Sequence, residues 1–125
     1  MARSDIDSDT ARHALAGMRL AMGTSAILAP RMLGRAFGLD PERNPAAPLI
    51  ARMFGARNVA IGIRLFDAQG EELDYWLQAG VAVDAFDAIA VVVARARGYV
   101  PTRTAVLGLA AALSAVAAGV QAREN

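Results

Sequence analysis

Cysteine and lysine are absent from this chain, and its single histidine is His13. Without cysteine there is no disulfide, no thiolate nucleophile and no zinc-thiolate site. We therefore expect no metal and no cofactor. The phosphate-binding glycine loops and the H-E-x-x-H and G-x-S-x-G motifs are also missing. We favour a non-enzymatic protein on these grounds and keep an enzyme as the alternative.

An excess of charge of one sign is missing too. The 13 basic and 12 acidic residues leave a net charge of +1, and aromatic residues make up only 6% of the chain. No basic run is interleaved with aromatic residues, so we do not expect nucleic acid as a partner. Three aspartates precede the first apolar stretch, unlike the basic start of a cleaved signal peptide. We expect the first helix to be retained.

Apolar sequence is what the chain has in abundance, at 55% hydrophobic residues against 20% charged ones. Its 125 residues are enough for one domain, and β-branched residues do not alternate with polar ones, which favours helix over sheet. We expect the first helix to start at a cap on Asp9 or Thr10 and the third to end before Gly98. The prediction is a single domain over residues 1–125, with antiparallel helices at about 11–29, 47–67, 73–96 and 104–122 and a short interfacial helix after the first.

Residues 104–122 contain no charge and are long enough to cross a bilayer. On the 73–96 helix the charged residues Asp84, Asp87 and Arg95 fall within an arc of about 80°, and apolar residues cover most of the rest. Tyr75 and Tyr99 stand near the two boundaries of this helix, as an aromatic belt requires. We therefore predict an all-α bundle of four transmembrane helices, with a soluble helical bundle as the alternative.

The placement of arginine predicts how such a bundle is oriented. The first and third loops hold six arginines, whereas the termini and the second loop together hold three. Short loops rich in arginine stay in the cytoplasm. We expect a multi-pass protein of the bacterial inner membrane with both termini outside and loops one and three cytoplasmic.

Small residues form a stripe along the last helix, at i, i+4, i+7 and i+11. Such faces let helices approach closely in lipid, although an alanine-rich helix also produces them by chance. Besides membrane lipid, we expect this stripe to contact another membrane subunit or a second copy of the chain. Its residues are Gly108, Ala112, Ala115 and Gly119.

A polar cluster is predicted between the second and third helices. Because a short turn joins them, we expect them to pack antiparallel, with Arg57 at the depth of Asp84, about 20 Å from the turn. Asp87 lies one turn further on and is expected to share the same guanidinium. Asn58 is placed to add a neutral donor and acceptor. For Arg19 on the first helix, joining this cluster and reaching the membrane surface are equally open.

Two hypotheses account for this cluster. In the first, it fixes the register of two helices in a non-enzymatic accessory or interaction subunit. In the second, it is the site of a membrane-embedded enzyme or carrier, where Arg57 holds a small lipophilic or anionic molecule and Asp84 or Asp87 accepts a proton. The first is our leading hypothesis.

The stretches "GARNVAIGIRL" and "GVAVDAFDAIAVV" resemble a family of small four-helix integral membrane proteins common in actinobacteria and known only as a domain of unknown function. Its pattern of Gly-x-Arg-Asp/Asn on the second helix and an Asp pair on the third is matched by Gly55, Arg57, Asn58, Asp84 and Asp87. The resemblance covers most of residues 13–122. Small membrane proteins of the DoxX type are also similar. Both resemblances imply a fold and a membrane location, and neither implies an activity.

Overall fold

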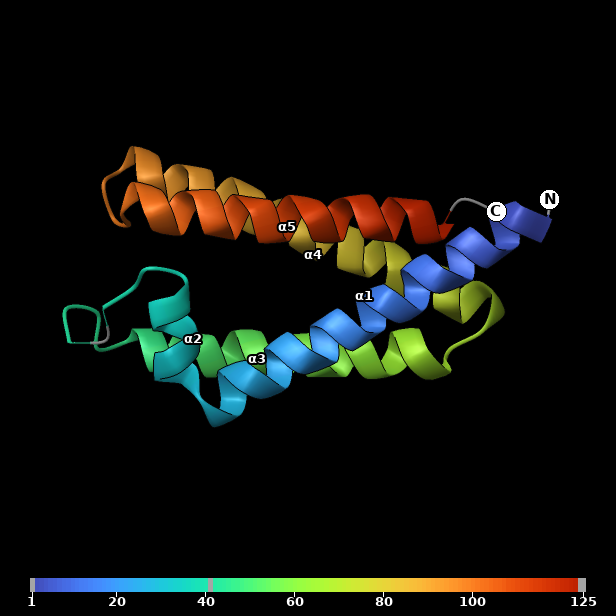
Figure 1. Ribbon diagram of the computed structural model, residues 1–125, viewed down its shortest axis with the longest axis horizontal. Coiled ribbons are helices and arrows are strands. Elements are labelled where there is room, and N and C mark those ends of the chain that lie inside the picture. Colours follow the sequence, from blue (N-terminus) through green and yellow to red (C-terminus); the bar gives the residue numbers. More distant parts are fainter. Residues whose placement is uncertain (1, 41, 124–125) are drawn as a thin grey trace.

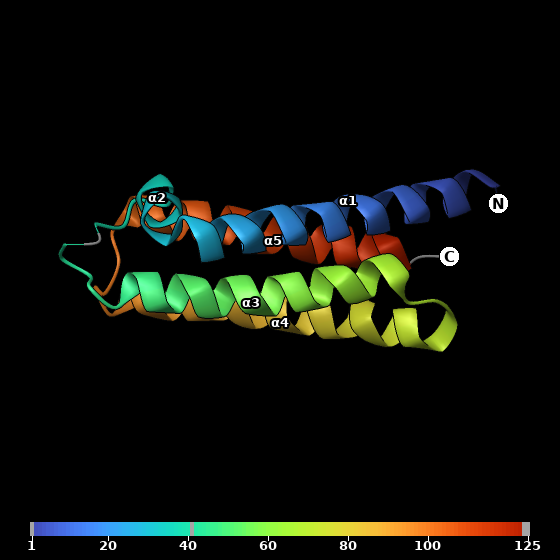
Figure 2. The same cartoon turned by 90° about the horizontal axis from the view of Figure 1, so that it is seen from below.

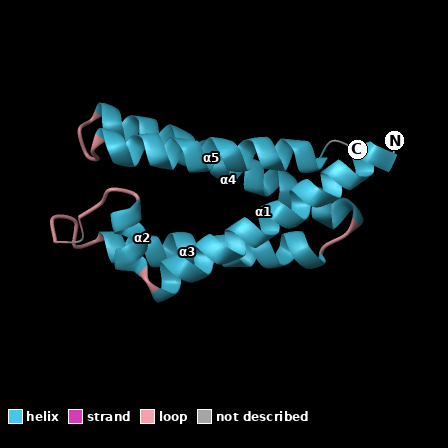
Figure 3. Ribbon diagram, in the orientation of Figure 1, coloured by secondary structure: helices cyan, strands magenta, loops and turns pink. Residues whose placement is uncertain are grey.

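The computed structural model describes residues 2–40 and 42–123, with side chains from Asp9 onward. All regular structure in these ranges is helical, which confirms the predicted all-α class (Figure 3). The longest connection between helices is the one that follows the short second helix. The helices are α1 (Ala2–Leu28), α2 (Pro30–Ala36), α3 (Ala47–Asp67), α4 (Gly70–Ala96) and α5 (Thr102–Arg123).

The ends of the helices follow the breakers in the sequence, with one exception. α1 begins at Ala2, so the predicted cap at Asp9 or Thr10 is wrong. Residues 2–10 contain neither glycine nor proline, and nothing in them stops the helix. After α4, Gly98 has a φ of +75°, as expected for a residue that closes a helix. Glycine takes this left-handed conformation without a steric penalty.

The four long helices form two antiparallel pairs, α1 with α3 and α4 with α5 (Figure 1). Figure 2 shows the same helices running lengthwise beside one another. The pairs meet at the turn between α3 and α4, which we call the closed end. They diverge toward α2 and the connection between α4 and α5, the open end, so that Figure 1 shows a V.

The pairing of helices differs from the one expected from their order in the chain. α3 and α4 are consecutive, yet they contact each other little beyond the turn. α1 is the main neighbour of α3 and also packs against α5. The short turn at Ala68 and Gln69 fixes where α4 starts but not its direction, so α1 takes the place beside α3 that we expected for α4.

Glycines allow α1 and α3 to approach closely. A Cβ at Gly55 would lie 2.5 Å from the carbonyl oxygen of Gly23, and a Cβ at Gly23 would lie 2.7 Å from the carbonyl oxygen of Gly55. Further along α3 toward the closed end, a Cβ at Gly62 would lie 2.9 Å from the side chain of Leu20 on α1. The two backbones are therefore in direct contact, which explains why this pair dominates the packing.

The small-residue stripe of α5 packs inside the chain. Ala112, Ala115 and Gly119 are buried, and a Cβ at Gly119 would lie 2.6 Å from a methyl group of Val81 on α4. A Cβ at Gly108 would lie 3.2 Å from Val91, also on α4. Gly108 and Gly119 thus lie against α4, and a contact of this stripe with another subunit or a second copy stays a prediction.

Large apolar side chains cover much of the exterior. Two described helices, α4 and α5, are long and apolar enough to cross a membrane, whereas α1 and α3 do not meet that criterion because of their polar and charged residues. A bundle of four membrane spans is therefore not confirmed by composition. The most exposed apolar side chains include Leu28, Met32, Leu49, Ile50, Met53, Phe66, Phe86, Ile89 and Leu113.

We expect Gly55→Ala to lower the free energy of unfolding by about 1–3 kcal/mol, because the added methyl group forces α1 and α3 apart. Gly17→Ala is the matched control, since a Cβ there meets nothing within 4 Å. That change should be neutral or stabilise by up to about 1 kcal/mol through helix propensity. Thermal unfolding in detergent, followed by circular dichroism, measures both variants. Equal stability of the two would contradict the close contact.

Candidate functional site

Arg19 lies at the centre of the molecule, although it comes from an apolar stretch of α1. Its side chain is only 2% exposed and forms an ion pair with Asp84 on α4. Its Nη1 donates to Asn58 Oδ1 on α3 at 2.7 Å, and its Nη2 donates to the carbonyl oxygen of Gly80 at 3.3 Å. One guanidinium group thus joins α1 to both α3 and α4.

The acceptors around Arg19 are held in place by their surroundings. Asn58 Nδ2 donates to the carbonyl oxygen of Phe54 at 3.0 Å, which turns its Oδ1 toward the guanidinium. A Cβ at Gly80 would lie 3.1 Å from Arg19 Nη2, so the absence of a side chain leaves room for the guanidinium. Gly80 was not among the residues predicted from the sequence. Its position one turn before Asp84, on the same face of α4, is the signal that could have found it.

A second ion pair joins α3 to α4. Arg57 Nη2 donates to Asp87 Oδ2 at 2.6 Å, and Arg57 Nη1 donates to Asp87 Oδ1 at 3.4 Å. The two side chains are 37% and 28% exposed, so this pair is half-buried where the first is enclosed. The guanidinium also lies over the ring of Phe54, 5.4 Å from its centroid. Two parallel hydrogen bonds fix the orientation of the pair.

The pairing differs from the predicted one. We expected Arg57 between Asp84 and Asp87, but each aspartate has its own arginine. The physical reason is the position of α1, which places Arg19 against α4 at the depth we had assigned to Arg57. The structure thus brings Arg19, Asn58 and Asp84 into one network, with Arg57 and Asp87 as a separate pair.

Arg64 lies at the closed end, away from these pairs. It forms an ion pair with Asp67 at 2.9 Å and another with Glu72 at the start of α4. Arg64 thus finds its acidic partners beside the turn and is not paired with Asp84 or Asp87.

A cavity of about 980 Å³ opens beside both ion pairs. It lies between the helix pair α1–α3 and the helix pair α4–α5, which we call the two arms. It extends toward the open end, where Phe37 and Leu39 of the connection after α2 also line it. Its inner wall carries the five polar residues Arg19, Arg57, Asn58, Asp84 and Asp87. Apolar walls come from all four long helices, through side chains such as Met18, Ile50, Phe54, Val91 and Ala111.

Three residues that line this cavity carry a buried polar atom without a hydrogen-bond partner among the described residues. They are Arg19 with its Nε, Arg57 with its Nε and Thr104 with its Oγ1. Buried polar groups are rarely left unpaired, because each one loses its hydration without a replacement. Two of these atoms, the Nε atoms of the arginines, are donors only.

A metal site of ordinary composition is not found in the described part of the chain. No group of three or more His, Cys, Asp or Glu side chains gathers there in a way that could hold an ion. The polar side chains of the cavity are those of Arg19, Arg43, Asn44, Arg57, Asn58, Asp84, Asp87 and Thr104.

Comparison with known proteins identifies a family. The family described as "Domain of unknown function (DUF4267)" matches residues 16–121, which is most of the chain, and the chain therefore belongs to it. The match includes Arg19, Arg57, Asp84 and Asp87. No curated protein and no solved structure matches the chain. The family confirms the resemblance to a domain of unknown function and assigns no activity.

We expect Asp84→Ala to lower the free energy of unfolding by about 3–5 kcal/mol, because it leaves the buried charge of Arg19 without its counter-ion. Asp87→Ala should cost less, since Arg57 is 37% exposed and can be solvated in part. Chemical unfolding in detergent measures both variants.

The double variant Arg19→Met with Asp84→Leu serves as the control for this comparison. Replacing both members of a buried ion pair by apolar residues is often neutral, so the double variant should regain most of the lost stability. If it stays as unstable as Asp84→Ala, the loss does not come from the unpaired charge.

Proposed function

We propose that this member of the DUF4267 family is a multi-pass membrane protein in which all four long helices cross the bilayer. The exposed apolar exterior supports this proposal, because soluble proteins rarely expose so much contiguous apolar surface. Hydropathy favours only α4 and α5. In α1 and α3, however, Arg19 and Arg57 point inward and are paired with aspartates, which is how membrane proteins carry charged side chains.

The dimensions of the helices are consistent with this placement. α3 has 21 residues, and the rise of 1.5 Å per residue makes it about 32 Å long, against about 30 Å of hydrocarbon. Tyr75 and Tyr99, near the two ends of α4, are 63% and 69% exposed. Exposed tyrosines at both ends of a span suit the two membrane interfaces.

The orientation follows from the arginines at the open end. We place the connections after α1 and after α4 in the cytoplasm and both termini outside, in the inner membrane of a bacterium. An actinobacterial source and a relation to DoxX-type proteins stay predictions from the sequence.

For its function, we infer that the protein binds a small lipophilic molecule that carries one polar head group. The observation that carries this inference is the cavity of about 980 Å³, apolar along its walls and polar at its inner end. Binding sites for small molecules typically measure about 300–1,000 Å³ and combine apolar walls with a few polar groups. Arg57 lines the cavity with a side chain that is 37% exposed, and each of its Nη atoms carries a second N–H that can donate to the head group without breaking the pair with Asp87.

The two ion pairs then have different roles. The buried pair of Arg19 and Asp84 holds the two arms together, as our leading hypothesis expected of the cluster. The half-buried pair of Arg57 and Asp87 faces the bound molecule. Both carboxylates are engaged by guanidinium groups, so we infer binding or transport of the molecule, not its chemical conversion. Service as an accessory subunit stays a prediction.

The membrane topology is tested with single cysteines, for which this cysteine-free chain is suited. We expect Glu71→Cys, at the closed end, to react with a membrane-impermeant maleimide in intact cells. Arg97→Cys, at the open end, should react only after the membrane is permeabilised. The reversed pattern would reverse the orientation, and recovery of the protein in the soluble fraction without detergent would contradict the membrane proposal.

The binding proposal is tested by photolabelling with a long-chain fatty acid that carries a diazirine on its chain. We expect the purified protein to be labelled at cavity-lining residues, as located by mass spectrometry. Ala111→Phe fills the cavity from α5 and should reduce this labelling at least about tenfold, since a filled site excludes the ligand.

Ala110→Phe is the matched control. Ala110 is the neighbouring residue, exposed on the outer face of α5 and not part of the cavity lining. This variant should keep the cavity labelling. If both variants label like the unchanged protein, or if the label is found only on the exterior, the cavity is not the binding site.

A further inference from the structure

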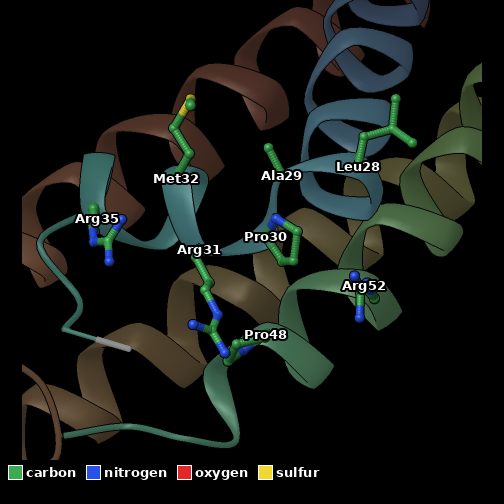
Figure 4. Close-up of a pocket in the computed structure, with 8 residues that line it drawn as sticks. All are labelled: Leu28, Ala29, Pro30, Arg31, Met32, Arg35, Pro48 and Arg52. Carbon is green, nitrogen blue, oxygen red and sulfur yellow. The ribbon is translucent and has the colours of Figure 1, made fainter. Parts of the chain in front are cut away.

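A second, separate cleft lies on the outside of the open end. It has a volume of about 430 Å³ and is formed where the end of α1, the short helix α2 and the start of α3 meet. Three arginines line it, Arg31 and Arg35 from α2 and Arg52 from α3 (Figure 4). In that view Arg31 extends from α2 toward Pro48 at the start of α3. None of these residues belongs to the lining of the larger cavity.

No acidic side chain balances this group of arginines. The eight residues that line the cleft include no aspartate or glutamate. Arg31 and Arg35 have no ion pair with any residue that the structure describes, and the only bond of Arg52 is from its Nε to the carbonyl oxygen of Ile27, at 3.3 Å. Arg19 and Arg57, in contrast, are each paired with an aspartate. The cleft therefore carries a local charge near +3 that an anion would neutralise.

Apolar side chains border the same cleft. Leu28 and Met32 line it and are 78% and 70% exposed. Pro30 and Pro48 also line it, and their rings fix the backbone on either side of the arginines. A site with arginines next to exposed apolar side chains matches a molecule with an anionic head and hydrocarbon chains.

We propose that this cleft binds the phosphate head group of an anionic phospholipid. Arginine presents a planar set of donors that fits the oxygens of a phosphate, and three exposed arginines from two helices line the cleft. The acyl chains run along Leu28 and Met32 into the bilayer. The site rests on the membrane placement proposed above, but it is independent of the ligand in the large cavity.

The experiment compares lipids that differ only in their head groups. The protein is purified in detergent, mixed with equal amounts of phosphatidylglycerol and phosphatidylcholine of identical chains, and analysed by native mass spectrometry. We expect phosphatidylglycerol to be retained in preference. In the double variant Arg31→Gln with Arg35→Gln, this preference should fall about tenfold or more, because each arginine near an anionic lipid contributes a substantial part of the attraction.

Arg97→Gln with Arg103→Gln is the matched control. These arginines are exposed at the same end of the molecule but lie outside the cleft, and the change in net charge is identical. The control should keep the preference. An equal loss in both double variants would show general attraction to a basic surface and overturn the site.

A second experiment distinguishes binding of the lipid from binding of a free anion. An excess of inorganic phosphate should not displace phosphatidylglycerol, because phosphate lacks the apolar part of the ligand. Full displacement would assign the cleft to a small anion and overturn the lipid proposal. If the protein fails to reconstitute into vesicles of either lipid, the membrane placement itself is contradicted. A loss of photolabelling in the large cavity concerns the other binding site and does not bear on this cleft.

Discussion

The arrangement of the helices depends on the hydrogen bonds of one guanidinium group. Arg19 is buried, and a buried charge is stable only where its donors meet acceptors in fixed positions. Asp84, Asn58 and the carbonyl oxygen of Gly80 are those acceptors, and they come from two helices that otherwise contact each other little. The side chain of Arg19 therefore reaches α4 from α1, while the backbone of α1 packs against α3 and α5. The close glycine contact holds α1 against α3 at this depth.

The two arginine–aspartate ion pairs differ in how far they are buried. This difference suits one pair to holding the helices together and the other to contact with a ligand. The pair on Asp84 is almost fully buried, and with Asn58 it connects three helices. The pair on Asp87 also lines the cavity but is 37% and 28% exposed. An exposed pair can exchange part of its bonding with a ligand at a lower cost than a buried one, whose charges must stay paired.

Local patterns in the sequence predicted the helices well, because proline, glycine and long apolar runs act over a few residues. They also identified the polar residue types of the site. Arg57 pairs with Asp87 as expected but not with Asp84, because the prediction treated neighbours in the chain as neighbours in space. Nothing in the sequence near Arg19 indicates how deeply its side chain is buried. Its contact with Asp84 joins residues that are 65 positions apart. Such a contact depends on which helices pack against each other. Gly23 and Gly55 let α1 pack against α3, but a single sequence does not show that these two glycines face each other.

The V shape has a mechanical consequence. The two arms are joined near the closed end and by the Arg19 network at mid-height. When the angle between them changes, the displacement of a residue grows with its distance from that joint. From Asp84 to the end of α4 at Ala96 is about 18 Å, and a rotation of about 10° there moves the tip by about 3 Å. The same rotation hardly displaces the buried ion pair. A rotation of that size would change the width of the open mouth of the cavity by about 3 Å while the pair of Arg19 and Asp84 stays intact.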